Sequence, residues 1–235
     1  MRGVLAVESQ EGAVTLYEAD CIEILEQLRG QRVVFITDPP YGISLSNHGK
    51  AGGRRKEEYA IEGDGDRETS LKVLGWAMEW GVPTIAFASP WAPWPGVWRD
   101  MIAYDKGGAV GGGGDTRLCL KRTWELIQVA RTRVMNGSRE GSVWRFPMVP
   151  RDTVLHIAAK PEELMTKLVL KYTTEDDVVI DPFMGSGTTG VACIQAGRRF
   201  IGIEKVPAIY QIAQRRIEET LMQPLMAMMG GGNGR

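Results

Sequence analysis

The sequence contains few of the residues that build disulfide scaffolds and structural zinc sites. Its 235 residues include three cysteines, Cys21, Cys119 and Cys193, and two histidines. An odd number of widely separated cysteines indicates reduced thiols inside the cell and not a disulfide framework. The lack of any Cys-x-x-Cys pair argues against a structural zinc site. We therefore expect a fold that needs neither disulfides nor a metal.

Long apolar runs and an excess of one charge are also lacking. The chain has no stretch of 18 apolar residues, and residues 1–14 lack the apolar core of a signal peptide. These features predict a cytoplasmic protein without a membrane partner. With 28 Lys+Arg and 29 Asp+Glu, the net charge of -1 argues against indiscriminate polyanion binding. It leaves a local basic surface open.

Short β-rich runs alternate with helical patterns along the chain. The runs hold β-branched or aromatic residues and mostly stop at Gly, Pro or Asp, which is typical of strands. Such alternation predicts an α/β fold with a doubly wound, mostly parallel sheet. The expected strands are Val14–Tyr17, Val33–Thr37, Thr84–Ala88, Met101–Tyr104, Val178–Asp181 and Phe200–Glu204, and the expected helices are Cys21–Leu28, Leu71–Trp80, Pro161–Tyr172 and Pro207–Leu221.

Three segments fit no regular element, namely 43–70, 105–116 and 131–153. Loops of this length inside a compact domain are usually functional or disordered. The middle segment holds the run Gly111–Gly114, and the whole chain is rich in glycine, with 29 residues. A length of 235 residues suits a single domain, which we place at 1–229, with a flexible tail over 230–235.

The first chemical motif, Asp38-Pro39-Pro40-Tyr41, directly follows an expected buried strand. Ligands of open α/β sheets bind at the carboxyl ends of the strands. The two prolines fix φ and remove two backbone donors, so the turn displays a carboxylate, bare carbonyls and an aromatic ring. Such a turn can accept hydrogen bonds from the exocyclic amine of a planar base and stack against that base. A plain strand-ending turn with Asp38 as a local cap is the alternative.

The second motif runs from Asp181 to Gly190, with Gly185, Gly187 and Gly190 in the spacing G-x-G-x-x-G. It follows one expected strand and opens a helix, and Glu204 ends the next strand. Glycines let the backbone approach a ligand, and an acid at that strand end can accept hydrogen bonds from ribose hydroxyls. The motif therefore predicts a nucleoside cofactor. An acid beside a pyrophosphate is unfavourable, whereas it suits the ammonium and sulfonium of S-adenosylmethionine.

Together the two motifs resemble those of the DNA amino-methyltransferases, which use S-adenosylmethionine to methylate N6 of adenine or N4 of cytosine. The catalytic motif precedes the cofactor loop, as in the permuted group called β-class. The resemblance implies a seven-stranded Rossmann-like sheet, S-adenosyl-L-homocysteine as a product, and no metal. It implies Asp38, Pro39, Pro40 and Tyr41 as catalytic residues, and Asp20, Lys160, Asp181, Phe183, Gly185, Ser186, Gly187, Thr188 and Glu204 as cofactor-binding residues.

The resemblance further implies direct methyl transfer to a flipped-out base, and an Asp at the first motif position favours adenine N6. Asp38 and the Pro39 carbonyl would orient the amine, and Tyr41 would stack on the base. Cytosine C5 chemistry is disfavoured, because no cysteine follows a proline. The sequence departs from the family at His156-Ile-Ala-Ala-Lys160-Pro161, where relatives usually have His-Pro-Thr-x-Lys-Pro.

Double-stranded DNA is the expected partner, and basic residues in the loops are the candidate phosphate contacts. They are Arg54, Arg55, Lys56, Arg117, Lys121, Arg122, Arg131, Arg133 and Arg139. Segments 43–70 and 131–153 are the expected DNA-recognition insertions, because no large segment resembles a separate recognition domain. A homodimer is expected because relatives often dimerise, and any restriction nuclease would be a separate chain.

Other functions remain open from the sequence alone. A cytosine-N4 DNA methyltransferase or an RNA amino-methyltransferase would use the same site, whereas protein glutamine methyltransferases usually have Asn before Pro-Pro-Tyr. A nicotinamide-dependent oxidoreductase would use the glycine loop but leave the first motif unexplained. Trp91, Trp94 and Trp98 could stack on nucleic acid, although such side chains are more often core or loop anchors.

Overall fold

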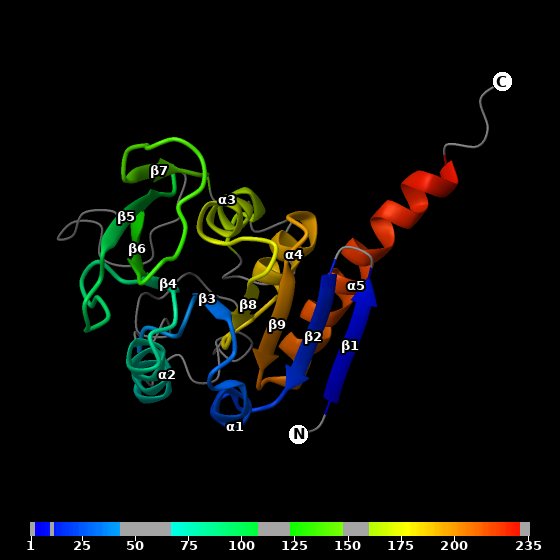
Figure 1. Cartoon of the computed structure of the whole chain (residues 1–235), viewed down its shortest axis with the longest axis horizontal. Helices are drawn as coiled ribbons and strands as arrows, with labels where there is room; N and C mark the ends of the chain where they lie inside the picture. The colour runs from blue at the N-terminus through cyan, green and yellow to red at the C-terminus, as the bar shows by residue number, and fades with distance from the viewer. Residues whose placement is uncertain (1–2, 10–11, 43–66, 108–122, 148–159, 231–235) are drawn as a thin grey trace, which may run out of the picture.

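The computed structural model describes residues 3–9, 12–42, 67–107, 123–147 and 160–230, which form one sheet with helices around it (Figure 1). The strands are β1 (Gly3–Ser9), β2 (Gly12–Glu18), β3 (Val33–Thr37), β4 (Thr84–Ala88), β5 (Asp100–Asp105), β6 (Trp124–Ala130), β7 (Val143–Arg145), β8 (Val178–Asp181) and β9 (Arg199–Glu204). The helices are α1 (Cys21–Leu25), α2 (Glu68–Glu79), α3 (Glu162–Tyr172), α4 (Thr188–Gln195) and α5 (Pro207–Gly230).

The strands follow the order β1-β2-β9-β8-β3-β4-β6-β5-β7. The five strands from β2 to β4 in this order are parallel to one another. On one side β1 pairs antiparallel to β2, and on the other β6 runs antiparallel to both β4 and β5. The predicted doubly wound α/β class is confirmed. The sheet has nine strands where seven were expected, because β1 and β7 extend its two edges.

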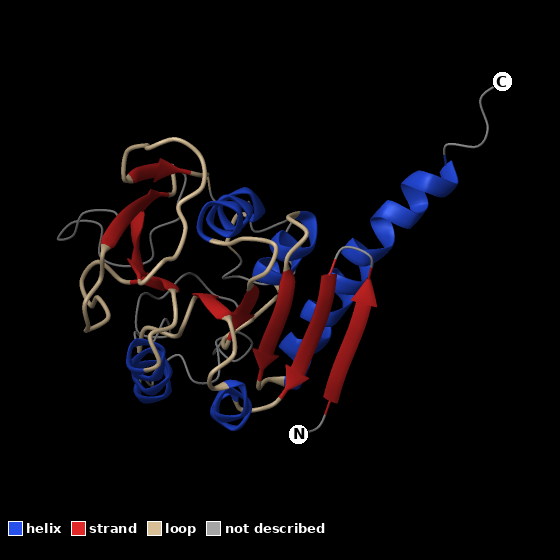
Figure 2. Ribbon diagram, viewed as in Figure 1, coloured by secondary structure: helices blue, strands red, loops and turns tan. Residues whose placement is uncertain are grey.

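Helices cover both faces of the sheet (Figure 2). Alternate side chains of β3 show why, since Val33 and Phe35 pack in one apolar cluster with α1 and α2, whereas Val34 and Ile36 pack in another with α3, α4 and α5. All five side chains of β3 are therefore buried. Such continuous apolar strands are typical of a parallel sheet that is covered on both faces.

The expected helices are present with small changes at their ends. The first continues beyond α1 as a 3-10 turn over Glu26–Leu28, and the last extends to Gly230. Helix α3 begins directly after Pro161, with two acidic residues in its first turn and Lys171 in its last. These charges complement the helix dipole at both ends.

Two cysteines among the described residues, Cys21 and Cys193, are buried free thiols, as expected from the sequence. Burial raises the pKa of the Cys21 thiol to about 12 and that of the Cys193 thiol well above its ordinary value. Both therefore behave as small apolar core residues. Within the described ranges, no helix is long and apolar enough to cross a membrane.

Candidate functional site

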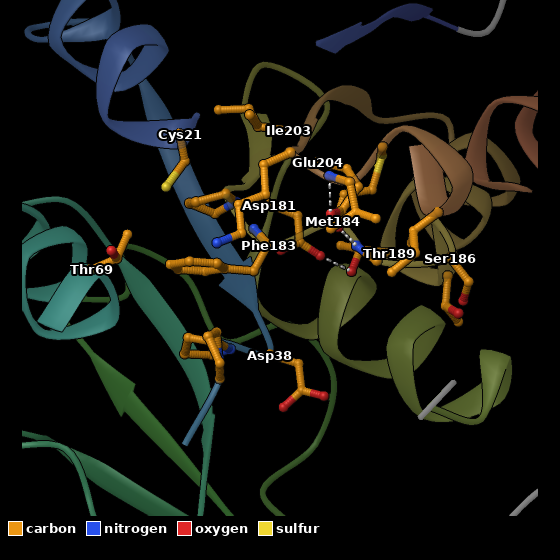
Figure 3. A pocket seen from close by; sticks show the side chains of 18 of the residues that line it. Cys21, Asp38, Thr69, Asp181, Phe183, Met184, Ser186, Thr189, Ile203 and Glu204 are labelled. Atoms are coloured by element: carbon orange, nitrogen blue, oxygen red, sulfur yellow. Dashed lines mark hydrogen bonds between the residues drawn. The ribbon is translucent and has the colours of Figure 1, made fainter. Parts of the chain in front are cut away.

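A pocket lies at the carboxyl ends of the central parallel strands, and both sequence motifs line it. Figure 3 shows Asp38, Asp181 and Glu204 around it, each at the end of a different strand. The motifs are 143 residues apart in sequence when counted from Asp38 to Asp181, but β3 and β8 are neighbours in the sheet, with Phe35 paired to Ile180. The permuted order of the motifs thus leads to one shared site.

The turn Asp38–Tyr41 is held by contacts from three directions. The Tyr41 hydroxyl donates to Asp38 Oδ1 at 2.5 Å, and Lys160 Nζ lies 2.6 Å from Asp38 Oδ2. The Ser70 hydroxyl of α2 donates to the carbonyl of Pro40 at 3.0 Å. The Tyr41 ring also packs beside Trp94, with ring centroids 6.3 Å apart. All four motif residues line the pocket, so the turn presents its carboxylate and its ring to the same space.

Asp181 joins the two motifs. Its carboxylate is 2% exposed and accepts hydrogen bonds from the hydroxyls of Thr37 (2.7 Å) and Thr189 (2.6 Å) and from the N–H of Phe183 (3.2 Å). Burial raises its pKa to about 6, although these three donors favour the charged form. The sequence placed this carboxylate opposite the cations of a cofactor. In the structure Asp181 lines the pocket, and its oxygens also connect the end of β3 to the start of α4.

The glycine loop takes a conformation that requires glycine. Gly187 has φ of +82° and precedes α4, and a Cβ there would lie 3.1 Å from Ala213 Cβ. At Gly190 a Cβ would lie only 2.7 Å from both Ile217 and Phe200. Gly187 and Gly190 therefore bring α4 against α5 and β9, a packing role. Gly185 and Ser186 line the pocket itself.

Two further acids face the pocket from the strand ends beside the loop. Glu204 accepts from the N–H groups of Gly185 (3.0 Å) and Val206 (2.9 Å), and burial raises the pKa of its carboxyl. Asp20 is exposed and caps α1 by accepting a hydrogen bond from the N–H of Ile22 at 2.9 Å. The cavity is thus bordered by the carboxylates of Asp20 and Glu204 near the loop, and by that of Asp38 near the turn.

Arg216 of α5 was missed by the sequence reasoning. Its Nη1 donates to the Ser186 carbonyl (2.7 Å) and to the Thr188 hydroxyl (3.2 Å), and its Nη2 pairs with Glu162 at 2.7 Å. The side chain therefore links the glycine loop to α3 and α5. An arginine on an amphipathic helix carries no local signal of such a role, because the contact joins residues 30 apart in sequence.

The predicted DNA contacts are only partly within the described residues. Those outside them are Arg54, Arg55, Lys56, Arg117, Lys121 and Arg122, together with His156, Cys119 and the run Gly111–Gly114. The predicted insertions at 43–70 and 131–153 are described only over 67–70, where α2 begins, and 131–147.

Segment 131–142 does not lie at the pocket. Arg133 donates to the carbonyl of Val33 (3.0 Å), at the start of β3, and pairs with Asp177 at 3.3 Å. Asn136 Nδ2 donates to the carbonyls of Leu170 and Thr173 at the end of α3. These contacts place Arg133 and Asn136 at the amino ends of the parallel strands, and no residue of 131–142 is among those that line the pocket at the carboxyl ends. The structure therefore does not bring Arg131, Arg133 and Arg139 to the pocket, and the guanidinium of Arg133 is engaged in holding the fold.

The three tryptophans named from the sequence differ in environment. Trp94 is 2% exposed and its indole N–H donates to the carbonyl of Phe87, which makes it a core anchor. Trp98 is partly buried and donates to the carbonyl of Trp94. Trp91 is 58% exposed and lies beside Trp124, with ring centroids 6.3 Å apart, just beyond the carboxyl end of β4.

Comparison with known proteins shows similarity to DNA methyltransferases over part of the chain. Residues 101–215 match the family model described as DNA methylase. One curated relative, the Type II methyltransferase M2.DpnII of Streptococcus pneumoniae, is 48% identical over 63 residues, which are 27% of this chain and 24% of that protein. The DNA adenine methyltransferase YhdJ of Escherichia coli (strain K12) is 40% identical over 81 residues, 33% of this chain and 28% of the relative. The chain thus matches about a quarter of the length of these relatives.

Solved structures extend the similarity to most of the fold. The crystal structure of an M1.HpyAVI–SAM complex superimposes with a TM-score of 0.63 and 23% sequence identity, covering 87% of this chain and 98% of that one. At this identity the likeness concerns the fold. It shows that the overall fold of this chain also occurs in a solved protein.

Proposed function

We propose that this chain, whose residues 101–215 match the family model described as DNA methylase, transfers a methyl group from S-adenosylmethionine to the exocyclic N6 of adenine in DNA. The observation that carries the proposal is the single pocket shared by the Asp38–Tyr41 turn and the glycine loop. An acceptor for an amine and a cradle for a nucleoside lie at adjacent strand ends. The names of the relatives, which include a DNA adenine methyltransferase, support the same assignment.

The residues around the loop fit S-adenosylmethionine. Two acids, Asp20 and Glu204, border the pocket near the loop and offer acceptors for ribose hydroxyls and for the ammonium group. A Cβ at Gly185 would meet no atom closer than 4.0 Å, so a side chain there would extend into free space beside the pocket. When bound, the cofactor supplies an electrophilic methyl group. The residues that we propose to hold it all line the pocket, and they are Asp20, Asp181, Phe183, Gly185, Ser186, Thr188 and Glu204.

The turn would bind and orient the base. The amine of adenine is a poor nucleophile because its lone pair is delocalised into the ring. Hydrogen bonds from this amine to the Asp38 carboxylate and to the Pro39 carbonyl would turn the lone pair away from the ring, and Tyr41 would stack on the base. Formation of the new N–C bond would be balanced by loss of the S–CH3 bond, whose electron pair stays on the sulfur of the departing S-adenosylhomocysteine. The amine would then lose one proton, for which Asp38 is the adjacent acceptor. Positioning and electrostatics supply the rate acceleration, so no covalent link to the protein is needed.

The depth of this site determines how a base in duplex DNA could reach it. The Asp38 side chain is 27% exposed. A base that is stacked in a duplex cannot reach this side chain without being flipped out. We propose duplex DNA as the substrate, with a homodimer and a separate restriction nuclease as further proposals from the family resemblance. The exposed rings of Trp91 and Trp124 beyond the end of β4 are a candidate contact surface for the DNA.

Transfer of labelled methyl groups from S-adenosylmethionine to duplex DNA, single-stranded DNA and RNA tests the proposal. Digestion to nucleosides should give N6-methyladenine from duplex DNA, whereas N4-methylcytosine or labelled RNA would overturn the assignment. Asp38→Ala should abolish transfer while cofactor binding remains measurable. Asp176→Ala is the matched control, because this acid is exposed in the turn before β8, at the other end of the sheet.

A further inference from the structure

A chain of four alternating charges runs from the catalytic turn to β5. Lys160 Nζ lies 2.6 Å from Asp38 and 3.1 Å from Glu125, and Lys106 forms an ion pair with the same Glu125 carboxylate. The two inner side chains are largely buried, with exposed fractions of 14% for Lys160 and 17% for Glu125. Neither Glu125 nor Lys106 was singled out by any motif.

The sheet topology explains how these residues meet. Strand β6 runs antiparallel to β4, so its start, where Glu125 lies, is at the same edge as the carboxyl end of β4. Strand β5 runs antiparallel to β6, which brings its end and the following Lys106 to this edge too. Lys160 reaches the edge from the residue before Pro161 at the start of α3. Four segments thus contribute one charge each beside the pocket.

These charges stabilise one another. Removing charged groups from water is costly unless each is paired with good geometry. Burial alone would raise the pKa of Glu125, but the ammonium groups of Lys160 and Lys106 hold it below its ordinary value. Burial alone would lower the pKa of Lys160, but Asp38 and Glu125 raise it. The chain of contacts therefore pairs two lysine side chains with two carboxylates in alternation.

The arrangement limits the orientations of the Asp38 carboxylate. One oxygen is bound by Lys160 and the other accepts from the Tyr41 hydroxyl, so rotation of the carboxylate would break both contacts. Each carboxylate oxygen has two lone-pair sites, so it can still accept from an amine. Lys160 is in turn fixed by Glu125, and Glu125 by Lys106.

We propose that Glu125 and Lys106 are positioning residues that act through Lys160 to hold the Asp38 carboxylate in the orientation that accepts the target amine. This inference rests on the proposed function. It also assigns Lys160 to the base-binding side of the pocket, whereas the sequence resemblance placed it with the cofactor. Since a displacement of about 1 Å at a reacting centre can lower a rate about 100-fold, loss of the Glu125 charge should slow the transfer step by a factor of that order.

The test measures single-turnover methyl transfer with saturating cofactor and DNA, beside the Kd for S-adenosylmethionine by calorimetry. Glu125→Gln keeps the shape of the side chain and should lower the single-turnover rate about 100-fold with an unchanged Kd. Lys160→Met should do the same, and Lys160→Arg should recover part of the rate. Glu140→Gln is the matched control, because Glu140 bridges Lys167 (2.6 Å) and Lys171 (2.8 Å) away from the pocket and should leave the rate unchanged.

Thermal unfolding of each variant keeps the test decisive. If Glu125→Gln does not fold, Lys106→Met removes only the outer charge and should lower the same rate to a smaller extent. A normal single-turnover rate in a folded Glu125 or Lys106 variant would overturn the positioning role alone. A rise in the Kd for the cofactor, with the rate restored at saturation, would instead place the chain of charges in the cofactor site. Absence of transfer in the unaltered protein would refute the proposed function itself.

Discussion

Replacing Asp181 by asparagine tests how the two motifs are joined. The carboxylate is 2% exposed, and burial raises its pKa from an ordinary 3.8 to about 6, although Thr37, Thr189 and Phe183 donate to it. Because the folded pKa is raised, the folded chain binds more protons than the unfolded chain between these two values. Stability therefore falls as the pH rises through this range.

The size of the effect follows from the shift. A rise of about 2 pKa units corresponds to about 3 kcal/mol of unfolding free energy. Relative to low pH, almost all of this stability is lost at pH 7, whereas only about 1 kcal/mol is lost at about pH 4.5. The unaltered protein should thus lose about 2 kcal/mol of unfolding free energy between these conditions because of Asp181. The Asp181→Asn variant has no charge to bury at this position and should not show that loss.

Urea unfolding of both proteins at several pH values measures the difference. The contributions of other acids to the unfolding free energy are the same in both proteins and cancel in this comparison. Among them are Asp177 and Glu140, whose pKa values are lowered, so their stabilising contribution is lost only as the pH falls. The unfolding free energy of the variant, relative to that of the unaltered protein, should rise by about 2 kcal/mol from about pH 4.5 to pH 7. A relative value that stays constant over this range would refute the argument from burial.

Three further substitutions test other parts of the account. Gly190→Ala should lower the unfolding free energy by about 1–3 kcal/mol in urea, because its Cβ would lie 2.7 Å from two core side chains. Arg216→Met should raise the Kd for S-adenosylmethionine about tenfold in calorimetry, because it removes charged donors to the loop. Asn136→Ala should cost about 1–2 kcal/mol in urea, with methyl transfer unchanged, because it uncaps two carbonyls at the end of α3.

The core of the fold could be predicted because its strands carry their own signal. The five residues of β3 are all apolar or β-branched, and Asp38-Pro39 ends the strand unambiguously. Strands β1, β6 and β7 were missed for a physical reason. In β6 the polar residues Glu125 and Gln128 contact Lys160, Lys106 and Trp94, which come from other segments of the described chain. Polar residues of this kind interrupt the apolar pattern by which a buried strand is recognised from its local sequence.

The candidate site was predictable to the extent that its residues are contiguous in sequence. The turn at Asp38 and the loop at Gly185 each form a short motif, and both line the pocket. Contacts between segments had no such signal, as Arg216 and Glu125 show. Arg133 is a further example, because its sequence context does not show that its guanidinium pairs with Asp177 and donates to the backbone of β3.

The central claim is that the Asp38 turn and the glycine loop serve one methyl-transfer site. The most direct measurement is labelled-methyl transfer to duplex DNA by the unaltered protein and by Asp38→Ala, with nucleoside analysis and cofactor binding measured on the same samples. The account predicts N6-methyladenine with the unaltered protein, and cofactor binding without transfer in the variant. Full transfer by Asp38→Ala, or no labelled adenine with the unaltered protein, would contradict it.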